Sequence, residues 1–105
     1  MDFLKRLFSS GPATDFGALV KEGALIIDVR TPAEFNTGHI RESVNIPLDR
    51  LKGKVEELRK KGKPVITCCR SGNRSGMAKS MLTAAGLNCC NGGAWDSLQR
   101  KLDQS

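Results

Sequence analysis

Two mainly apolar runs stand out along the chain, one over residues 24–29 with a charge, Asp28, near its end, and one over residues 64–68. Mainly apolar runs of this length are typical of strands that are covered on both faces in a parallel sheet. Shorter runs at 43–47 and 87–90 predict two further strands, and a tight turn is expected at 91–93. Apolar residues at helical spacing predict helices over 15–22, 48–61, 76–85 and 94–103. This alternation predicts an α/β fold, a parallel sheet of four to five strands with helices on both faces.

Capping residues mark where two of the helices begin. Thr14 is the expected N-cap of the helix at 15–22. Thr31, Pro32 and Glu34 have the spacing of a capping box, with threonine at the N-cap, proline at the first helical position and glutamate at the third. We therefore predict a short capped helical turn directly after the first long strand.

The length of 105 residues allows one domain of modest core size. Residues 1–11 form a separate amphipathic segment, and residues 12–105 are expected to form the domain. The apolar residues with helical spacing in that segment are Met1, Phe3, Leu4, Leu7 and Phe8. Because no apolar stretch is long enough for a membrane span or a signal-peptide core, the sequence predicts a cytoplasmic protein.

The chain is basic, with a formal net charge of +6. Many of its basic residues crowd into the twelve positions from Lys52 to Lys63. A basic surface attracts anionic partners, from small oxyanions to nucleic acid. The chain contains only four Phe, one Trp and no Tyr, and this scarcity of rings that could stack on bases disfavours nucleic-acid binding.

The four cysteines form two adjacent pairs, Cys68 with Cys69 and Cys89 with Cys90. This differs from the spacing that zinc sites prefer, and neighbouring residues on a strand point to opposite faces. The cysteine pattern therefore predicts neither a metal site nor a disulfide within a pair.

The segment 69–75 lies between the apolar run 64–68 and the helix predicted at 76–85. A loop that leaves a strand and opens a helix turns its backbone N–H groups inward, and the helix N-terminus adds partial positive charge. Cys69 is the first residue of this loop, so its thiolate is favoured and it is the candidate nucleophile. The expected anion cradle consists of Arg70, Ser71, Gly72, Asn73, Arg74 and Ser75. The alternative is a small buried cysteine that only ends a strand.

Two charged residues lie at the end of the first long strand. Asp28 and Arg30 are expected to support the site, because function in parallel sheets gathers at the carboxyl ends of strands. His39 is the only histidine, and nothing in its spacing brings it to Cys69. We therefore expect a structural role for His39 rather than a role as a base.

Three motifs follow one another along the chain. They are DVRTPAEF at 28–35 with GHI at 38–40 and NIPL at 45–48, CRSGNRS at 69–75, and a pair of glycines with a tryptophan at 92–95. In this order they resemble the signatures of the rhodanese family, and the resemblance covers roughly residues 12–103.

The resemblance implies a sulfurtransferase. In such an enzyme Cys69 would take a sulfane sulfur from a small anionic donor such as thiosulfate, hold it as a persulfide and pass it to cyanide, a thiol or an acceptor protein. Arg70 and Arg74 would hold the dianionic donor, and the N–H groups of the loop would stabilise the persulfide. Neither a metal nor an organic cofactor is expected.

Two alternatives stay open at this stage. Cys68 followed by five residues, Arg74 and Ser75 has the spacing of a cysteine phosphatase loop, which would place phosphate or arsenate chemistry on Cys68. The chain could also serve as a sulfur-relay or binding module, with Cys68, Cys89 or Cys90 receiving the sulfur.

Overall fold

The computed structural model describes residues 14–105. The elements in chain order are α2 (Phe16–Lys21), β1 (Leu25–Asp28), α3 (Pro32–Asn36), β2 (Val44–Asn45), α4 (Leu48–Leu51), a 3₁₀ turn (Lys52–Lys54), α5 (Val55–Lys61), β3 (Val65–Cys69), α6 (Asn73–Ala84), β4 (Cys89–Ala94) and α7 (Trp95–Asp103). The amphipathic segment predicted at 1–11 lies outside the described residues.

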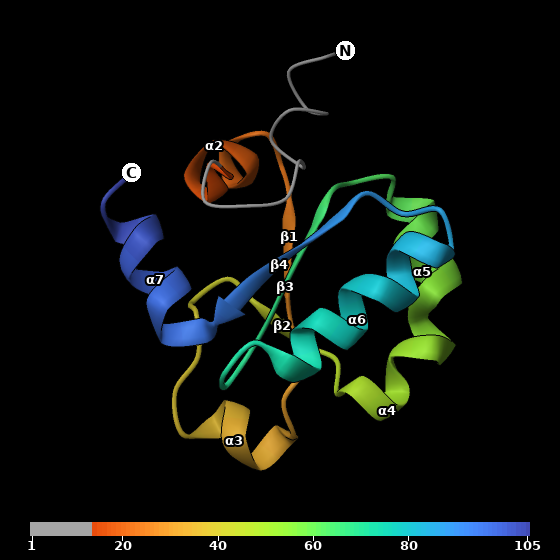
Figure 1. Cartoon of the computed structure of the whole chain (residues 1–105), viewed down its shortest axis with the longest axis horizontal. Coiled ribbons are helices and arrows are strands. Elements are labelled where there is room, and N and C mark those ends of the chain that lie inside the picture. The colour runs from red at the N-terminus through yellow and green to blue at the C-terminus, as the bar shows by residue number, and fades with distance from the viewer. Residues whose placement is uncertain (1–13) are drawn as a thin grey trace.

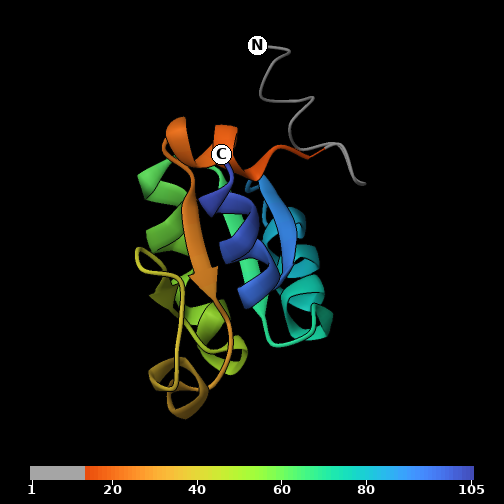
Figure 2. The same ribbon diagram turned by 90° about the vertical axis from the view of Figure 1, so that its left-hand side faces the viewer.

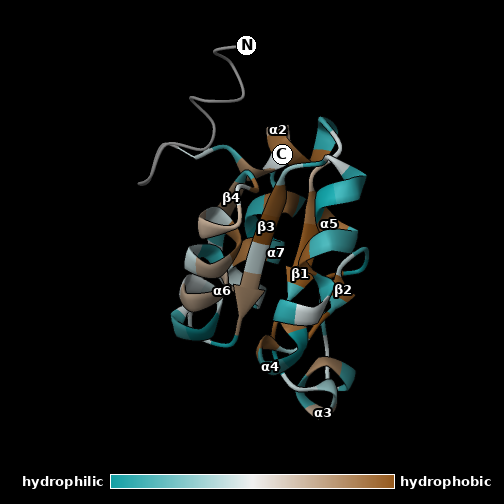
Figure 3. Cartoon of the chain, turned by 90° about the vertical axis from the view of Figure 1, so that its right-hand side faces the viewer, coloured by the Kyte–Doolittle hydropathy of each residue, from teal (hydrophilic) through white to brown (hydrophobic). Residues whose placement is uncertain are grey.

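The strands form a parallel sheet in the order β2-β1-β3-β4, with β1 and β3 at its centre; Figure 1 shows this sheet nearly edge-on, and Figure 3 shows the strands side by side. Helices α4, α5 and α6 lie on one face of this sheet, whereas α2 and α7 lie on the other (Figures 2 and 3). The predicted α/β fold is therefore confirmed. Among residues 14–105, no helix has the length and apolar character needed to cross a membrane.

Each face of the sheet has its own hydrophobic core. On β1, Ile27 packs in the core beneath α4, α5 and α6, together with Leu82 of α6. The preceding residue, Ile26, packs in the opposite core with Leu98 of α7. All four of these side chains are at most 5% exposed. Burial on both faces explains why the central strands are mainly apolar in the sequence.

The carboxyl ends of the strands meet at one edge of the sheet, next to α3 (Figure 1). Asp28, the last residue of β1, pairs in register with Cys68 of β3. The segment after β1 and the loop after β3 are therefore neighbours in space, although they are far apart in the chain. This juxtaposition brings the candidate residues of both segments to the same edge.

Several element boundaries differ from those predicted. The N-cap of α2 is Asp15, whose side chain accepts a hydrogen bond from the Ala18 N–H at 3.0 Å, one residue after the predicted Thr14. The single helix predicted over 48–61 is divided into α4, a 3₁₀ turn and α5. Gly53 lies in the 3₁₀ turn, and glycine weakens helix interiors. The capping box at α3, with Thr31 as N-cap, is confirmed.

The tight turn predicted at 91–93 was wrong, because these residues lie inside β4. The register against β3 shifts here: Thr67 pairs with Asn91, whereas Cys69 pairs with Ala94. A bulge of this kind accommodates glycines within a strand and bends it. A side chain at Gly92 would meet Leu98 and the Thr67 carbonyl, so β4 passes very close to its neighbours at this point.

Replacing Gly92 by alanine is expected to destabilise the domain by about 1–3 kcal/mol through overpacking. The added Cβ would lie 2.8 Å from the Leu98 Cδ2 and 2.9 Å from the Thr67 carbonyl oxygen, which belongs to the central strand and cannot easily move. Urea unfolding measures the loss. Gly53→Ala is the matched control, since no atom lies within 4 Å of its added Cβ, and it should keep or raise the stability. Equal stability of the two variants would contradict the close approach of β4.

Candidate active site in the loop after β3

The sulfur of Cys69 lies inside the loop that connects β3 to α6. It accepts hydrogen bonds from the Gly72 N–H at 3.0 Å and the Ser75 N–H at 3.3 Å. The Ser75 hydroxyl oxygen lies 3.3 Å from the same sulfur. Only 1% of Cys69 is exposed, yet its sulfur is surrounded by polar hydrogens at the N-terminus of a helix.

These contacts shift the ionisation of Cys69. Burial of the sulfur opposes the thiolate, but hydrogen bonds from the Ser75 hydroxyl and from the N–H groups of Ser75, Gly72 and Ser71 outweigh it. The pKa of Cys69 is therefore lowered from its ordinary value. A lowered pKa keeps a cysteine ionised, and hence nucleophilic, at pH values where a free thiol is protonated.

The other three cysteines lack this environment. Burial raises the pKa of Cys68 to about 12, that of Cys89 to about 12 and that of Cys90 to about 11. Cys68 packs in the core beneath α2 and α7, whereas Cys69 packs on the opposite face of the sheet. All four thiols are free and buried. Only Cys69 combines a nucleophilic atom with donors that stabilise its charged form.

The shape of the loop depends on Gly72. Its φ is +103°, a conformation that is strained for residues with a side chain, and it precedes α6 directly. The left-handed turn starts the helix at Asn73, three residues earlier than the sequence predicts. Ser75 therefore belongs to the first turn of α6, where its N–H is free to bind the Cys69 sulfur. Ser71 and Asn73 are exposed at the surface of the loop.

The two arginines of the loop have different environments. Arg74 forms a two-pronged ion pair with Glu34 of α3, with N–O distances of 2.8 and 2.9 Å. The hydrogen bond from Arg74 holds the pKa of Glu34 down to about 2. Arg70 is exposed and lines a hollow of about 390 Å³, together with Arg30, Glu34 and Trp95.

Asp28 and Arg30 form a buried ion pair behind this hollow. The shortest bond joins the Arg30 Nη2 to the Asp28 Oδ2 at 2.7 Å, and the two residues are 3% and 0% exposed. Hydrogen bonding to Asp28 raises the pKa of Arg30. The guanidinium also donates to the carbonyls of Glu34 and Gly38 and lies 4.8 Å from the ring centre of Trp95. The pair therefore anchors α3 and its following loop to the sheet.

His39 lies with α3 rather than with Cys69. Its ring stacks on Phe35 with the ring centres 3.7 Å apart, and its Nδ1 lies 2.7 Å from the Phe35 carbonyl oxygen. A hydrogen bond at this distance requires the hydrogen on Nδ1. These contacts agree with a structural role for the only histidine in the sequence.

Sequence patterns alone did not reveal two partners of the site. Glu34 reaches Arg74 from forty positions away, and Asn91 of β4 accepts a hydrogen bond from the Ser75 hydroxyl at 2.6 Å. The sequence pattern predicts a capping role for Glu34 and a position in a turn for Asn91. Neither pairing has a local spacing signal, because both partners arrive through the packing of separate elements.

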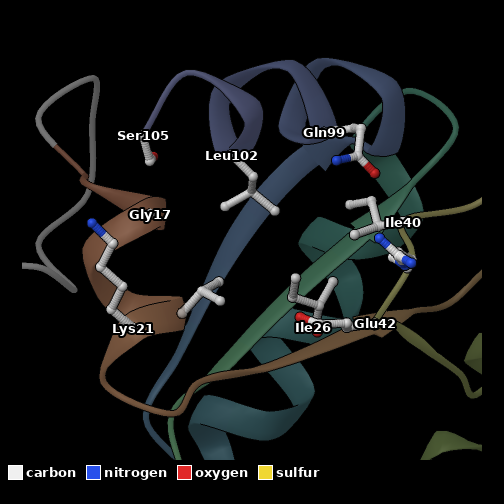
Figure 4. A pocket seen from close by; sticks show the side chains of 10 residues that line it. Gly17, Lys21, Ile26, Ile40, Glu42, Gln99, Leu102 and Ser105 are labelled. Atoms are coloured by element: carbon white, nitrogen blue, oxygen red, sulfur yellow. The ribbon is translucent and has the colours of Figure 1, made fainter.

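A second hollow lies elsewhere on the molecule, and none of the four cysteines lines it. Its volume is about 350 Å³, and it lies between α2 and α7, lined by Ile26, Ile40 and Leu102 together with the polar side chains of Lys21 and Gln99 (Figure 4). Within residues 14–105, no group of three or more His, Cys, Asp or Glu side chains is placed to hold a metal ion.

Comparisons with known proteins agree on one family. The family model of the rhodanese-like domain matches residues 12–96. The thiosulfate sulfurtransferase GlpE of Pseudomonas syringae is 31% identical over 81 residues, which are 77% of this chain and 76% of that protein. A solved structure of a rhodanese with anions from E. coli has a TM-score of 0.65 and 29% identity, and the match covers 70% of this chain and 89% of that one.

A further relative is longer than this chain. The uncharacterized protein YqhL of Bacillus subtilis is 46% identical over 63 residues, which are 60% of this chain and 49% of that protein. This chain therefore matches about half the length of YqhL. The family match includes β1, the loop after β3 and β4, and the parallel sheet agrees with the solved rhodanese. This chain belongs to the family of rhodanese-like domains.

Proposed function

We propose that residues 12–105 act as a sulfurtransferase that carries a sulfane sulfur as a persulfide on Cys69. The observation that carries this proposal is the position of the Cys69 sulfur, which accepts N–H hydrogen bonds at the N-terminus of α6 and has a lowered pKa. The same donors that stabilise a thiolate would stabilise a persulfide anion. Relatives that are named sulfurtransferases, such as GlpE, support the reaction class.

The first step is attack of the Cys69 thiolate on the outer sulfur of thiosulfate. A new S–S bond forms on Cys69, the S–S bond of thiosulfate breaks, and sulfite leaves with the electron pair. In the second step a nucleophile such as cyanide or a thiolate attacks the outer sulfur of the persulfide and restores the Cys69 thiolate. Each step conserves charge and needs no oxidant or reductant.

Arg70 is the residue best placed to attract the donor. It is exposed, follows Cys69 directly and lines the hollow beside α3. Arg74 shares its charge with Glu34, so the doubly charged donor meets a weaker positive field than two unpaired arginines would provide. Ser71, Gly72, Asn73 and Ser75 complete the proposed cradle. Asp28 and Arg30 hold the scaffold around it.

The two alternatives find less support. Phosphate or arsenate chemistry on Cys68 would require a thiolate there, but Cys68 is fully buried in the core and its pKa is raised to about 12. A relay within the chain would require Cys68, Cys89 or Cys90 as acceptor, and all three are buried with raised pKa values. We therefore infer that the acceptor is a small molecule or a thiol of another protein.

Treatment with thiosulfate followed by mass spectrometry tests the proposed function. We expect one added sulfur atom on Cys69, removed again by cyanide with the release of thiocyanate. Absence of the added sulfur, or its attachment to Cys68, Cys89 or Cys90, would refute a persulfide on Cys69. Phosphatase turnover without sulfur loading would favour the Cys68 alternative.

Replacing Glu34 by glutamine is expected to lower the KM for thiosulfate by up to about tenfold, because Arg74 then keeps its full charge for the donor. Glutamine can still serve as the third residue of a capping box, so α3 should form as before. Steady-state kinetics with thiosulfate and cyanide measures the change. Glu42→Gln removes the same charge from an exposed position and is the matched control. Equal effects of both variants would show that only net charge matters.

A further inference from the structure

Asn91 connects three parts of the candidate site from the bulge in β4. Its Oδ1 accepts hydrogen bonds from the Ser75 hydroxyl at 2.6 Å and from the Gly93 N–H at 2.9 Å. Its Nδ2 donates to the Gly72 carbonyl at 3.2 Å. The Gly93 N–H can bond only to the oxygen of the Asn91 amide, and the Gly72 carbonyl can bond only to its nitrogen. These two partners therefore determine the orientation of the amide. Asn91 does not contact the Cys69 sulfur but reaches it through Ser75.

The Ser75 hydroxyl has a single hydrogen and two neighbours that could accept it. One is the Asn91 Oδ1 at 2.6 Å, and the other is the Cys69 sulfur at 3.3 Å. The Asn91 Oδ1 cannot donate, so the short bond requires the hydroxyl hydrogen to point toward Asn91. In this arrangement a lone pair of the hydroxyl oxygen faces Cys69, and the protonated thiol can donate to it. A Cys69 thiolate, in contrast, is stabilised when the Ser75 hydroxyl donates this hydrogen to the sulfur.

We propose that Asn91 is a positioning residue for Cys69, which holds the hydrogen of the Ser75 hydroxyl away from the sulfur until the thiolate forms. Formation of the thiolate turns the hydroxyl toward the sulfur, and the Asn91 Oδ1 keeps the hydrogen bond from the Gly93 N–H. The short bond between Asn91 and Ser75 therefore favours the protonated thiol. The proposal deepens the proposed function, because it concerns the thiolate that the sulfur transfer uses.

The charged groups around Cys69 are the same in the unsubstituted chain and in a variant with a neutral residue at position 91. They include the Asp28–Arg30 pair, the pair between Glu34 and Arg74, and the exposed Arg70, and the neighbouring titratable thiols are Cys68 and Cys89. The buried side chains that α4 and α5 present on this face are apolar. A neutral substitution at position 91 therefore changes hydrogen bonding to Ser75 without changing the field of these groups. Asn91 is itself exposed, so its removal leaves the core intact.

The test is the pH dependence of Cys69 alkylation by iodoacetamide, followed by mass spectrometry at Cys69. Asn91→Ala should shift the midpoint to lower pH by about one unit or less, since the Ser75 hydroxyl is then free to donate to the thiolate. Ser75→Ala should shift it to higher pH, because the donor is lost. In the Ser75→Ala background, adding Asn91→Ala should have no further effect.

An unchanged or higher midpoint in Asn91→Ala would overturn the proposal. A downward shift caused by Asn91→Ala in the Ser75→Ala background, where the hydroxyl is absent, would also overturn it. Asn88→Ala, at an exposed position just before β4, is the matched control and should leave the midpoint unchanged. Alkylation needs no sulfur donor, so this test stays informative even if thiosulfate fails to load Cys69. Loading of the unsubstituted chain by thiosulfate tests the proposed function separately.

Discussion

Replacement of Cys69 by serine is expected to abolish thiosulfate–cyanide sulfur transfer, with a loss of about 10³-fold or more. A serine hydroxyl is far less nucleophilic than a thiolate and cannot carry a second sulfur atom. The N–H groups of Gly72 and Ser75 that stabilise the sulfur anion would remain, but they would have no anion to bind. Thiocyanate formation measures turnover, and mass spectrometry of the thiosulfate-treated variant measures sulfur loading.

The matched variant is Cys68→Ala, one position earlier on β3. Its thiol lies in the core on the opposite face of the sheet, so its removal should cost some stability but leave turnover largely unchanged. Together the two variants separate the two possible registers of the loop. Loss of turnover in a folded Cys68→Ala variant, with activity retained in Cys69→Ser, would identify Cys68 as the nucleophile.

Replacement of Arg30 by methionine is expected to lower the free energy of unfolding by about 3–5 kcal/mol. Methionine keeps much of the apolar length of the side chain but leaves the Asp28 carboxylate buried without its cationic partner. Asp28 is 0% exposed and Arg30 is 3% exposed, so solvent cannot replace the lost bonds. The carbonyls of Glu34 and Gly38 would also lose a donor. Urea unfolding followed by circular dichroism measures the change.

Arg50→Met is the control for this prediction, because Arg50 is exposed at the end of α4. A surface substitution of this kind should change stability by only about 0.5 kcal/mol or less. A loss below about 1 kcal/mol in Arg30→Met would mean that the buried pair contributes little to anchoring α3. The difference in unfolding free energy between the two variants separates the effect of the buried charge from the effect of losing a long side chain.

Local patterns in the sequence predicted most of the elements and the order strand, loop, helix around Cys69. The mainly apolar runs at 24–29 and 64–68 contain β1 and most of β3, because a strand buried on both faces consists mostly of apolar residues. The capping box at Thr31 was predictable because all its hydrogen bonds join residues within one turn. The arginines and the backbone N–H donors at 69–75 were also predictable, because they lie within one short segment of the chain.

The tertiary structure decided which of these groups meet. Arg74 and Arg70 look alike in the sequence, but the fold brings the carboxylate of Glu34 to Arg74 and leaves Arg70 exposed. The register shift in β4 brings Asn91 to the Ser75 hydroxyl, where a turn had been predicted. Hydrogen bonds and ion pairs between distant segments depend on how whole elements pack, and no short-range pattern encodes that packing. Short-range patterns therefore predict most of the elements and the candidate nucleophile, whereas the partners of Arg74 and of the Ser75 hydroxyl follow from contacts between distant segments.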